Sequence, residues 1–208
     1  KHNCYDGYLH VKPVVFWQQE NLLQQYLPNL DRYIVLSDYD KRDYMEKLGI
    51  DCEVKINPRS FVSEKKCDVK SKRFLMATRF VYAKGLDLMM ESFEEFCKED
   101  SEWELDIIGD GDLFDQIRAD AKKRHLEKRV HFVGYTNEPE KYYLNSSVFL
   151  LPSRWEGWPM VIMEAFEFGL PVIAYHMGAM DLIIDDGKTG FLPEAFDPHK
   201  FAQAMLKL

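Results

Sequence analysis

The segment that most constrains the fold is residues 153–171, in which a loop leads into an apolar helix that stops at a Gly and a Pro. The apolar run before it, 148–151, is typical of a buried strand. Pro159 suits the first helical position, where its missing N–H would have had no intrahelical partner. Gly169 and Pro171 end the helix. The segment therefore predicts a strand, a loop and a helix joined in the manner of an α/β fold.

Two carboxylates mark this segment, Glu156 in the loop and Glu164 in the helix. Apolar side chains surround Glu164 on nearly every side, which predicts a helix buried between other elements. Because a buried carboxylate without a partner is costly, we expect Glu164 to face a polar group. The free N–H groups of the first helical turn favour an anion. The segment thus predicts a ligand with phosphate and hydroxyl groups, such as a nucleotide sugar. The alternatives are an exposed or Arg-paired Glu164 and a surface Glu156.

The spacing of these residues in S-R-W-E-G-W-P-M-V-I-M-E-A-F-E-F-G-L-P resembles the signature of retaining glycosyltransferases of family 4, a Glu, seven residues and a second Glu. The resemblance implies that Glu164 accepts hydrogen bonds from the ribose hydroxyls. It implies that Glu156 contacts the ring hydroxyls of the transferred sugar. Further donor-binding residues implied by the resemblance are Ser153, Gly157, Trp158, Pro159 and Met160.

Strand and helix patterns alternate from Arg73 onward. The predicted strands are 74–77, 105–108, 130–133, 148–151, 172–175 and 190–192. The predicted helices start near Lys84, Asp112 (as the cap), Glu138, Pro159, Asp181 and Asp197. This alternation predicts an α/β fold with a Rossmann-like, doubly wound parallel sheet that binds ligands at the carboxyl ends of its strands. The resemblance implies the GT-B type of this fold, with a partial N-terminal domain.

Three sequence regions are expected. They are 1–58, the C-terminal remnant of an acceptor-side domain; 59–72, a polar, Lys-rich linker; and 73–208, the donor-binding domain. A strand is predicted at 14–17. Chains of the resembled family are normally longer, so we expect these residues to be a fragment that holds the donor site and is weak or inactive alone.

Two cations precede the donor segment. Arg79 follows the strand at 74–77, and Lys84 opens the next predicted helix. The helix dipole disfavours a cation there by roughly 0.3–1 kcal/mol, a cost that a bound anion would remove. The alternative is that Lys84 points into water. The sequence R-F-V-Y-A-K-G resembles the family's Arg, four residues, Lys-Gly segment, which holds the donor diphosphate. Glu156, Arg79 and Lys84 are accordingly the expected catalytic residues. Thr78 stands where the family usually has Gly.

Two further motifs follow predicted strands. Gly109-Asp110-Gly111-Asp112 is either a metal-binding carboxylate pair or a turn with a helix cap, and the turn is favoured. The resemblance agrees, so no metal ion is expected. Tyr135 is either part of a simple turn or, by resemblance, a residue near the nucleotide base.

The composition limits the kinds of partner that this protein can bind. A net charge of −8 argues against an electrostatic nucleic-acid surface, so phosphate must be bound by a few local cations and backbone N–H groups. The four cysteines show neither close pairing nor a metal-binding spacing and favour a reducing cytosol. No apolar run is long enough to cross a bilayer. The expected location is the cytoplasm, with the inner membrane surface as an alternative.

The resemblance implies transfer of a hexosyl sugar with retention, in cell-surface polysaccharide biosynthesis. The expected substrates are a UDP-sugar, which serves without a cofactor, and a glycan or lipid-linked acceptor, with peripheral membrane association through an N-terminal domain. Two alternatives are a nucleotide-sugar epimerase of the same fold and a non-catalytic nucleotide-sugar-binding module.

Overall fold

The computed structural model describes residues 30–58 and 62–208. These fall into two compact units divided in the sequence after Pro58, and the second contains 62–208 apart from the loop residues 156–158. The units are described separately. The strand predicted at 14–17 lies outside the described residues.

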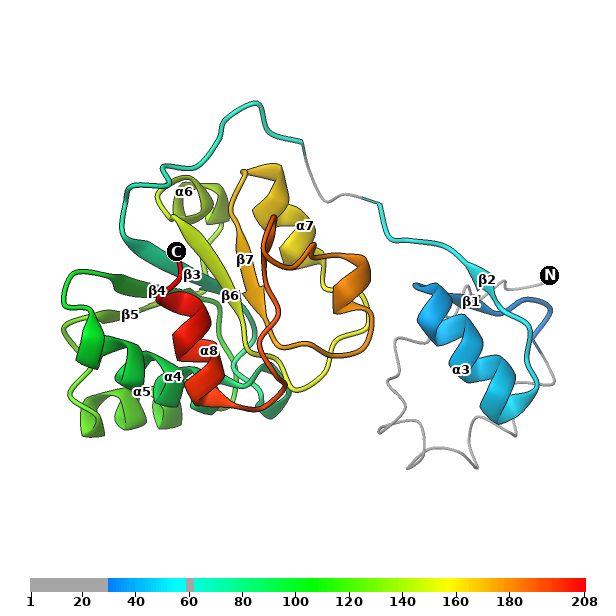
Figure 1. Cartoon of the computed structure of the whole chain (residues 1–208), viewed down its shortest axis with the longest axis horizontal. Coiled ribbons are helices and arrows are strands. Elements are labelled where there is room, and N and C mark those ends of the chain that lie inside the picture. Colours follow the sequence, from blue (N-terminus) through cyan, green and yellow to red (C-terminus); the bar gives the residue numbers. More distant parts are fainter. Residues whose placement is uncertain (1–29, 59–61) are drawn as a thin grey trace. The chain divides into compact units, whose positions relative to one another are not determined.

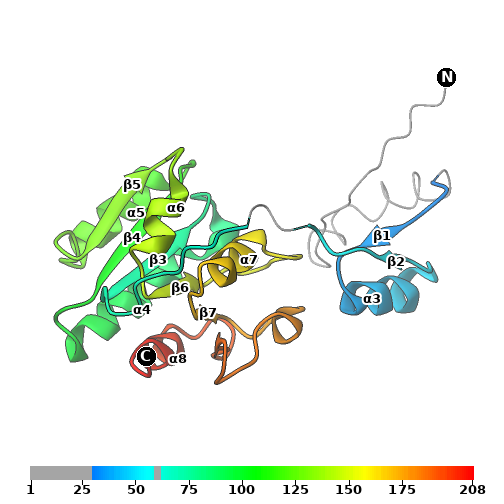
Figure 2. The same cartoon turned by 90° about the horizontal axis from the view of Figure 1, so that it is seen from above.

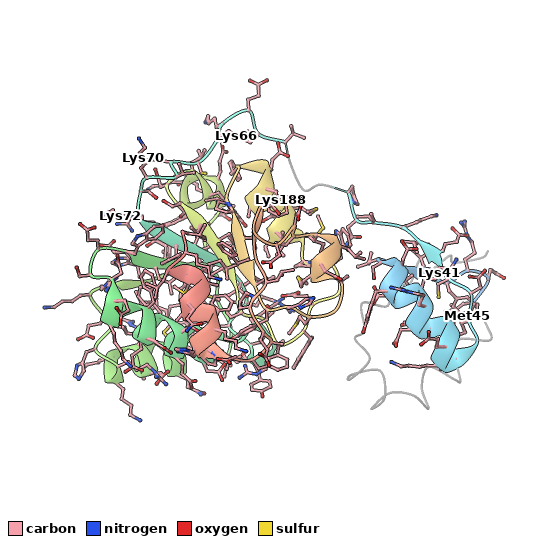
Figure 3. The ribbon with its side chains drawn as sticks, in the orientation of Figure 1. Lys41, Met45, Lys66, Lys70, Lys72 and Lys188 are labelled. Atoms are coloured by element: carbon pink, nitrogen blue, oxygen red, sulfur yellow. The ribbon has the colours of Figure 1, made fainter. Side chains whose placement is uncertain are left out.

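The first unit is a small β-α-β element. Strand β1 (Ile34–Val35) pairs in parallel with β2 (Glu53–Val54), and helix α3 (Asp38–Leu48) connects them. The Ser37 side chain accepts a hydrogen bond from the backbone N–H of Asp40 and so caps α3. Lys41 and Met45 lie on this helix (Figure 3). Each strand is two residues long.

The second unit is built on one parallel sheet (Figure 1). Its strands are β3 (Arg73–Ala77), β4 (Glu104–Ile108), β5 (Val130–Gly134), β6 (Val148–Leu151), β7 (Val172–Ala174) and β8 (Gly190–Phe191). Their spatial order is β5-β4-β3-β6-β7-β8, and every neighbouring pair is parallel. The chain therefore winds outward from β3 in one direction and from β6 in the other, as in a Rossmann domain.

Helices cover both faces of this sheet (Figures 1 and 2). They are α4 (Leu86–Glu99), α5 (Phe114–Lys123), α6 (Pro139–Leu144), α7 (Met160–Glu167) and α8 (Pro198–Met205). Two 3-10 turns, η2 (Tyr82–Lys84) and η3 (Met180–Leu182), complete the connections. Helices α4, α5 and α8 pack on one face, and α6 and α7 on the other. The predicted doubly wound α/β fold is confirmed.

Strand β3 shows how the sequence sets these layers. Phe74 and Met76 are buried among the residues of α4, α5 and α8, whereas Leu75 is buried on the α6 and α7 side. Successive side chains of a strand point to opposite faces, so a continuous apolar run serves two cores. Phe74 also stacks on Trp103, with ring centroids 4.4 Å apart.

Helix α7 differs from its prediction in two ways. Pro159 is the N-cap and the helix begins at Met160, so the placement of Pro159 at the first helical position is wrong by one residue. Only Ile162 and Ala165 are buried within the helix, so the prediction of a helix buried between other elements is also wrong. A helix on the outer face of a sheet buries one stripe only. Gly169, with φ 80°, follows the helix end as predicted.

Residues 62–72 run beside α6 and α7 without regular secondary structure. The backbone N–H of Cys67 donates to the carbonyl of Phe168 (2.8 Å), and that of Asp68 to Leu144 (3.0 Å). Lys66 Nζ donates to the carbonyl oxygen of Glu167. Lys66, Lys70 and Lys72 follow one another along this segment in Figure 3. These hydrogen bonds therefore hold the segment against the rest of the second unit.

Within the ranges 30–58 and 62–208, none of the helices is long and apolar enough to span a membrane.

Candidate functional site

A cavity of about 430 Å³ opens at the carboxyl ends of the strands in the second unit. Residues after β3, β4 and β5 line it, together with Lys84, the end of β6 and the starts of α6 and α7. The lining residues are Ala77, Thr78, Arg79, Lys84, Ile108, Gly109, Asp110, Tyr135, Thr136, Pro139, Leu151 and Val161. The strand order reverses between β3 and β6, and both contribute to the wall. Such a switch point is where open α/β sheets bind their ligands.

Arg79 and Lys84 both border this cavity. Arg79 is exposed, and no acidic side chain in the described ranges forms an ion pair with it. Lys84 is the last residue of η2, and α4 begins only at Leu86, so the prediction that Lys84 opens that helix is wrong. Gly85 intervenes in the left-handed conformation, with φ 63°. The two cations therefore reach one space from a loop and a tight turn.

Gly85 also allows two loops to pack closely. A Cβ atom placed on it would lie 2.0 Å from the carbonyl oxygen of Pro152, at the start of the β6–α7 loop. Two residues further, the backbone N–H of Arg154 donates to the carbonyl of Ala83 at 2.8 Å. The turn that carries Lys84 is thus held against the segment that leads to Glu156.

The Arg154 side chain strengthens this connection. Its Nη1 and Nη2 atoms donate to the two carboxylate oxygens of Asp87 at 2.8 and 2.6 Å, in the first turn of α4. Nη1 also donates to the carbonyl of Tyr82 at 2.9 Å, and the guanidinium lies 3.9 Å from the centre of the Tyr82 ring. Burial alone would raise the pKa of Asp87, but the hydrogen bonds and charge of Arg154 outweigh it and lower that pKa.

The Asp87–Arg154 pair predicts an acid-dependent contribution to stability. A carboxyl whose pKa is lower in the folded state stabilises the fold above its unfolded pKa, about 3.9. This stabilisation is lost as pH falls through the folded pKa. Asp87→Asn should therefore lower the free energy of unfolding by about 1 kcal/mol at neutral pH, a modest value because solvent screens a side chain that is 46% exposed.

Urea unfolding of wild type and Asp87→Asn from pH 7 to pH 3 checks this. The difference in the free energy of unfolding between the two proteins should stay constant down to about pH 5 and shrink below about pH 4. Asp185→Asn is the control, because Asp185 pairs with Lys188 across an exposed turn. A difference for Asp87→Asn that did not change with pH would contradict the assignment.

Glu164 has a polar partner that the sequence did not indicate. The hydroxyl of Tyr143, in α6, donates to Glu164 Oε2 at 2.8 Å. Glu164 is partly exposed, so its carboxylate is held by the Tyr143 hydroxyl but remains accessible from solvent. The Arg considered as an alternative partner does not occur. Burial, followed by the charge and hydrogen bond of Glu164, raises the pKa of Tyr143, so its hydroxyl stays protonated.

Residues 109–112 form a turn between two packed loops. A Cβ atom on Gly109 would lie 1.8 Å from the carbonyl oxygen of Thr78, so this position needs glycine. Asp110 Oδ1 accepts the N–H of Gly111 at 2.8 Å. The N-cap of α5 is Leu113, without a side-chain hydrogen bond, so the expected cap at Asp112 is wrong. In the described part of the chain, His, Cys, Asp and Glu side chains form no metal-binding group of three or more.

The structure brings together some of the predicted site residues. Arg79, Lys84 and Tyr135 share the cavity, and the Tyr135 side chain is 76% exposed there. Glu164 lies one helical turn after Val161, which borders the cavity. The remaining predicted residues lie in the β6–α7 loop or at the start of α7 and are not part of the cavity wall: Ser153, Glu156, Gly157, Trp158, Pro159 and Met160.

Comparison with known proteins found a family model that matches most of the chain. The family model described as Glycosyl transferases group 1 matches residues 60–208. An uncharacterized glycosyltransferase of Haemophilus influenzae is 29% identical over 167 residues, which is 79% of this chain and 47% of that protein. An amylovoran biosynthesis glycosyltransferase of Erwinia amylovora is 34% identical over 120 residues, 57% of this chain and 34% of that protein. The chain thus spans about half the length of these relatives or less.

The fold also matches a solved structure, TarM of S. aureus in complex with fondaparinux, alpha-GlcNAc-glycerol and UDP. The TM-score is 0.81 at 24% identity, covering 100% of this chain and 41% of that one. At this identity the likeness concerns the fold, which is the GT-B arrangement expected from the sequence.

Proposed function

The chain belongs to the family of glycosyl transferases group 1, and on that premise we propose that it holds the donor site of a retaining hexosyltransferase of family 4 that uses a UDP-sugar. The observation that carries the proposal is the cavity at the switch point of the sheet, which Arg79 and Lys84 border from two different loops. In a chain of net charge −8, two cations beside one concave site suit a diphosphate.

Each part of the donor has a proposed contact. The diphosphate lies between Arg79 and Lys84, and the base lies near Tyr135. The ribose hydroxyls donate hydrogen bonds to Glu164. Glu156 contacts the ring hydroxyls of the transferred sugar. Backbone N–H groups of Gly157, Trp158 and Met160, with Pro159 and Ser153 beside them, complete the sugar and phosphate contacts.

The proposed reaction needs no general base from these residues. The bond between the anomeric carbon and the diphosphate oxygen breaks, and the diphosphate leaves with the electron pair. The acceptor hydroxyl forms its bond to that carbon on the same face and passes its proton to a diphosphate oxygen. Arg79 and Lys84 stabilise the negative charge that develops on the diphosphate, which is where preorganised cations contribute most to a rate.

The proposal places the enzyme in cell-surface polysaccharide biosynthesis, as the name of the Erwinia relative supports. The acceptor is a glycan or a lipid-linked glycan at the inner face of the membrane, and membrane association comes from an acceptor-side domain of the whole protein. Residues 1–58 belong to that domain, 59–72 are the linker, and 73–208 bind the donor in the cytoplasm.

No metal ion takes part in the proposed donor binding. Asp110 borders the cavity, but its Oδ1 accepts the backbone N–H of Gly111, which supports the role of a turn residue and not of half a metal pair. Chelation with EDTA should therefore leave the dissociation constant for UDP within about twofold of its value in magnesium, since twofold is only about 0.4 kcal/mol. Calorimetry in the two buffers measures this. A tenfold loss on chelation would show that a cation bridges the phosphates.

The function is tested by calorimetric titration with UDP-, GDP- and ADP-sugars. Saturable binding of a UDP-sugar at micromolar to millimolar concentration is expected. If none of the three classes binds, the proposal fails. The family match does not favour the epimerase alternative. Incubation with donor alone, followed by analysis of the sugar, checks this, because an epimerase converts the sugar without an acceptor.

A further inference from the structure

We infer that Tyr143 is a positioning residue for Glu164, which it holds so that the carboxylate can recognise the ribose hydroxyls of the donor. This inference rests on the proposed function. The observation behind it is the 2.8 Å hydrogen bond from the Tyr143 hydroxyl to Glu164 Oε2, which joins α6 to α7. No other side chain in the described ranges donates to this carboxylate.

The Tyr143 ring is fixed on both sides. It stacks with Phe149 of β6, with centroids 5.8 Å apart and an interplanar angle of 13°. It also stacks with Phe168, at 5.2 Å and 17°. The side chain is fully buried. A ring with so little freedom presents its hydroxyl in one direction, so the hydrogen bond sets the position of the more mobile Glu164 side chain.

The charges also favour this arrangement. The raised pKa of Tyr143, caused by burial and by the Glu164 charge, keeps the hydroxyl protonated and able to donate. An ionised carboxylate has two oxygens with several acceptor sites. Tyr143 occupies part of one oxygen, Oε2, and leaves Oε1 for ligand hydroxyls. Partial exposure of Glu164 gives those hydroxyls access.

The pair lies next to the cavity along both helices. Val161 borders the cavity and precedes Glu164 by three residues, so the two share one face of α7. Pro139 borders the cavity and precedes Tyr143 by four residues, so these two share one face of α6. The hydrogen bond therefore continues the wall that α6 and α7 form. A nucleotide whose diphosphate meets Arg79 and Lys84 would bring its ribose toward this wall.

A purely structural role makes a different prediction. If the hydroxyl only satisfies a buried group, its removal perturbs the fold as a whole and weakens the binding of every ligand equally. If it positions Glu164, the loss is confined to ligands that carry ribose hydroxyls. Three probes separate the cases: UDP, 2′,3′-dideoxyuridine diphosphate and inorganic pyrophosphate.

Calorimetry on Tyr143→Phe tests the inference, since this variant keeps the stacked ring and removes the hydroxyl. UDP binding should weaken about fivefold, the size expected for the net contribution of one ordinary hydrogen bond. The dideoxy nucleotide and pyrophosphate should bind within about twofold of wild type. Tyr142→Phe is the matched control: Tyr142 is the preceding residue of α6, and its hydroxyl has no partner among the described residues. It should bind all three probes as wild type does.

Glu164→Gln tests the same hydrogen bond from its acceptor side and does not depend on how well Tyr143→Phe folds. Glu164→Gln should also lose the preference for UDP over the dideoxy nucleotide, and adding Tyr143→Phe to it should cost nothing more, because coupled residues are not additive. Equal weakening of all three probes, no change for UDP, or additive losses in the double variant would each overturn the inference alone. Failure of the wild type to bind UDP would overturn the proposed function and this inference with it.

Discussion

Replacing Lys84 with alanine is expected to weaken UDP binding about 10- to 100-fold, and Arg79→Ala should have an effect of the same size. Both side chains border the cavity, so each is placed to meet the same diphosphate. A charge-assisted hydrogen bond contributes about 1.5–3 kcal/mol, which corresponds to this range. Uridine, which has no phosphate, should bind the variants and the wild type equally. Calorimetric titration measures all these affinities.

The control for this prediction is Lys98→Ala. Lys98 is exposed near the end of α4, and its removal changes the net charge by the same amount. It should leave the affinity for UDP unchanged at physiological salt, since a distant exposed charge is screened. If Lys98→Ala weakened UDP binding as much as Lys84→Ala, overall charge would explain the effect and the cavity would not be the phosphate site.

Gly85→Ala is expected to cost about 2–4 kcal/mol of stability and to abolish detectable UDP binding. A non-Gly residue at φ 63° costs about 1–2 kcal/mol. The added Cβ would also lie 2.0 Å from the backbone oxygen of Pro152, which cannot rotate away. The turn that carries Lys84 and the loop that leads to Glu156 must then separate. Thermal unfolding should show a midpoint lower by about 5–15 °C.

Gly187→Ala is the matched control. Its φ of 78° is equally unfavourable to alanine, but no atom lies within 4 Å of the added Cβ. Gly187→Ala should lower the free energy of unfolding only by the cost of the left-handed backbone conformation, about 1–2 kcal/mol, and should leave UDP binding intact. The difference between the two variants isolates the contact of Gly85 with Pro152. Equal losses of stability, with UDP binding retained in both, would contradict the view that this contact organises the site.

The fold could be predicted because its signals are local. Five apolar runs fall within a residue or two of β3 to β7, and the helical patterns that follow these runs correspond to α4 to α8. A parallel sheet with helices on both faces follows from that alternation. The sheet also fixes which loops meet, so Arg79, Lys84 and Tyr135 could be expected at one edge from the sequence alone.

What the sequence could not give depends on contacts between distant residues. Tyr143 and Glu164 lie 21 residues apart, and Asp87 and Arg154 lie 67 apart. No local pattern indicates such partners. The wrong start of α4 has a different cause: Gly85 breaks the helical pattern after Lys84, and a 3-10 turn replaces the first predicted turn. An apolar sequence likewise suggested full burial of α7, because periodicity alone cannot show how many faces a neighbouring layer covers.

The most direct test of the account is a crystal structure of this chain with UDP. We expect the nucleotide in the cavity at the carboxyl ends of β3 to β6. Its diphosphate oxygens should lie within about 3.2 Å of the Arg79 guanidinium and Lys84 Nζ, and its ribose should face Glu164. UDP bound elsewhere, or bound in the cavity without contacting either cation, would contradict the assignment of this edge of the sheet as the donor site.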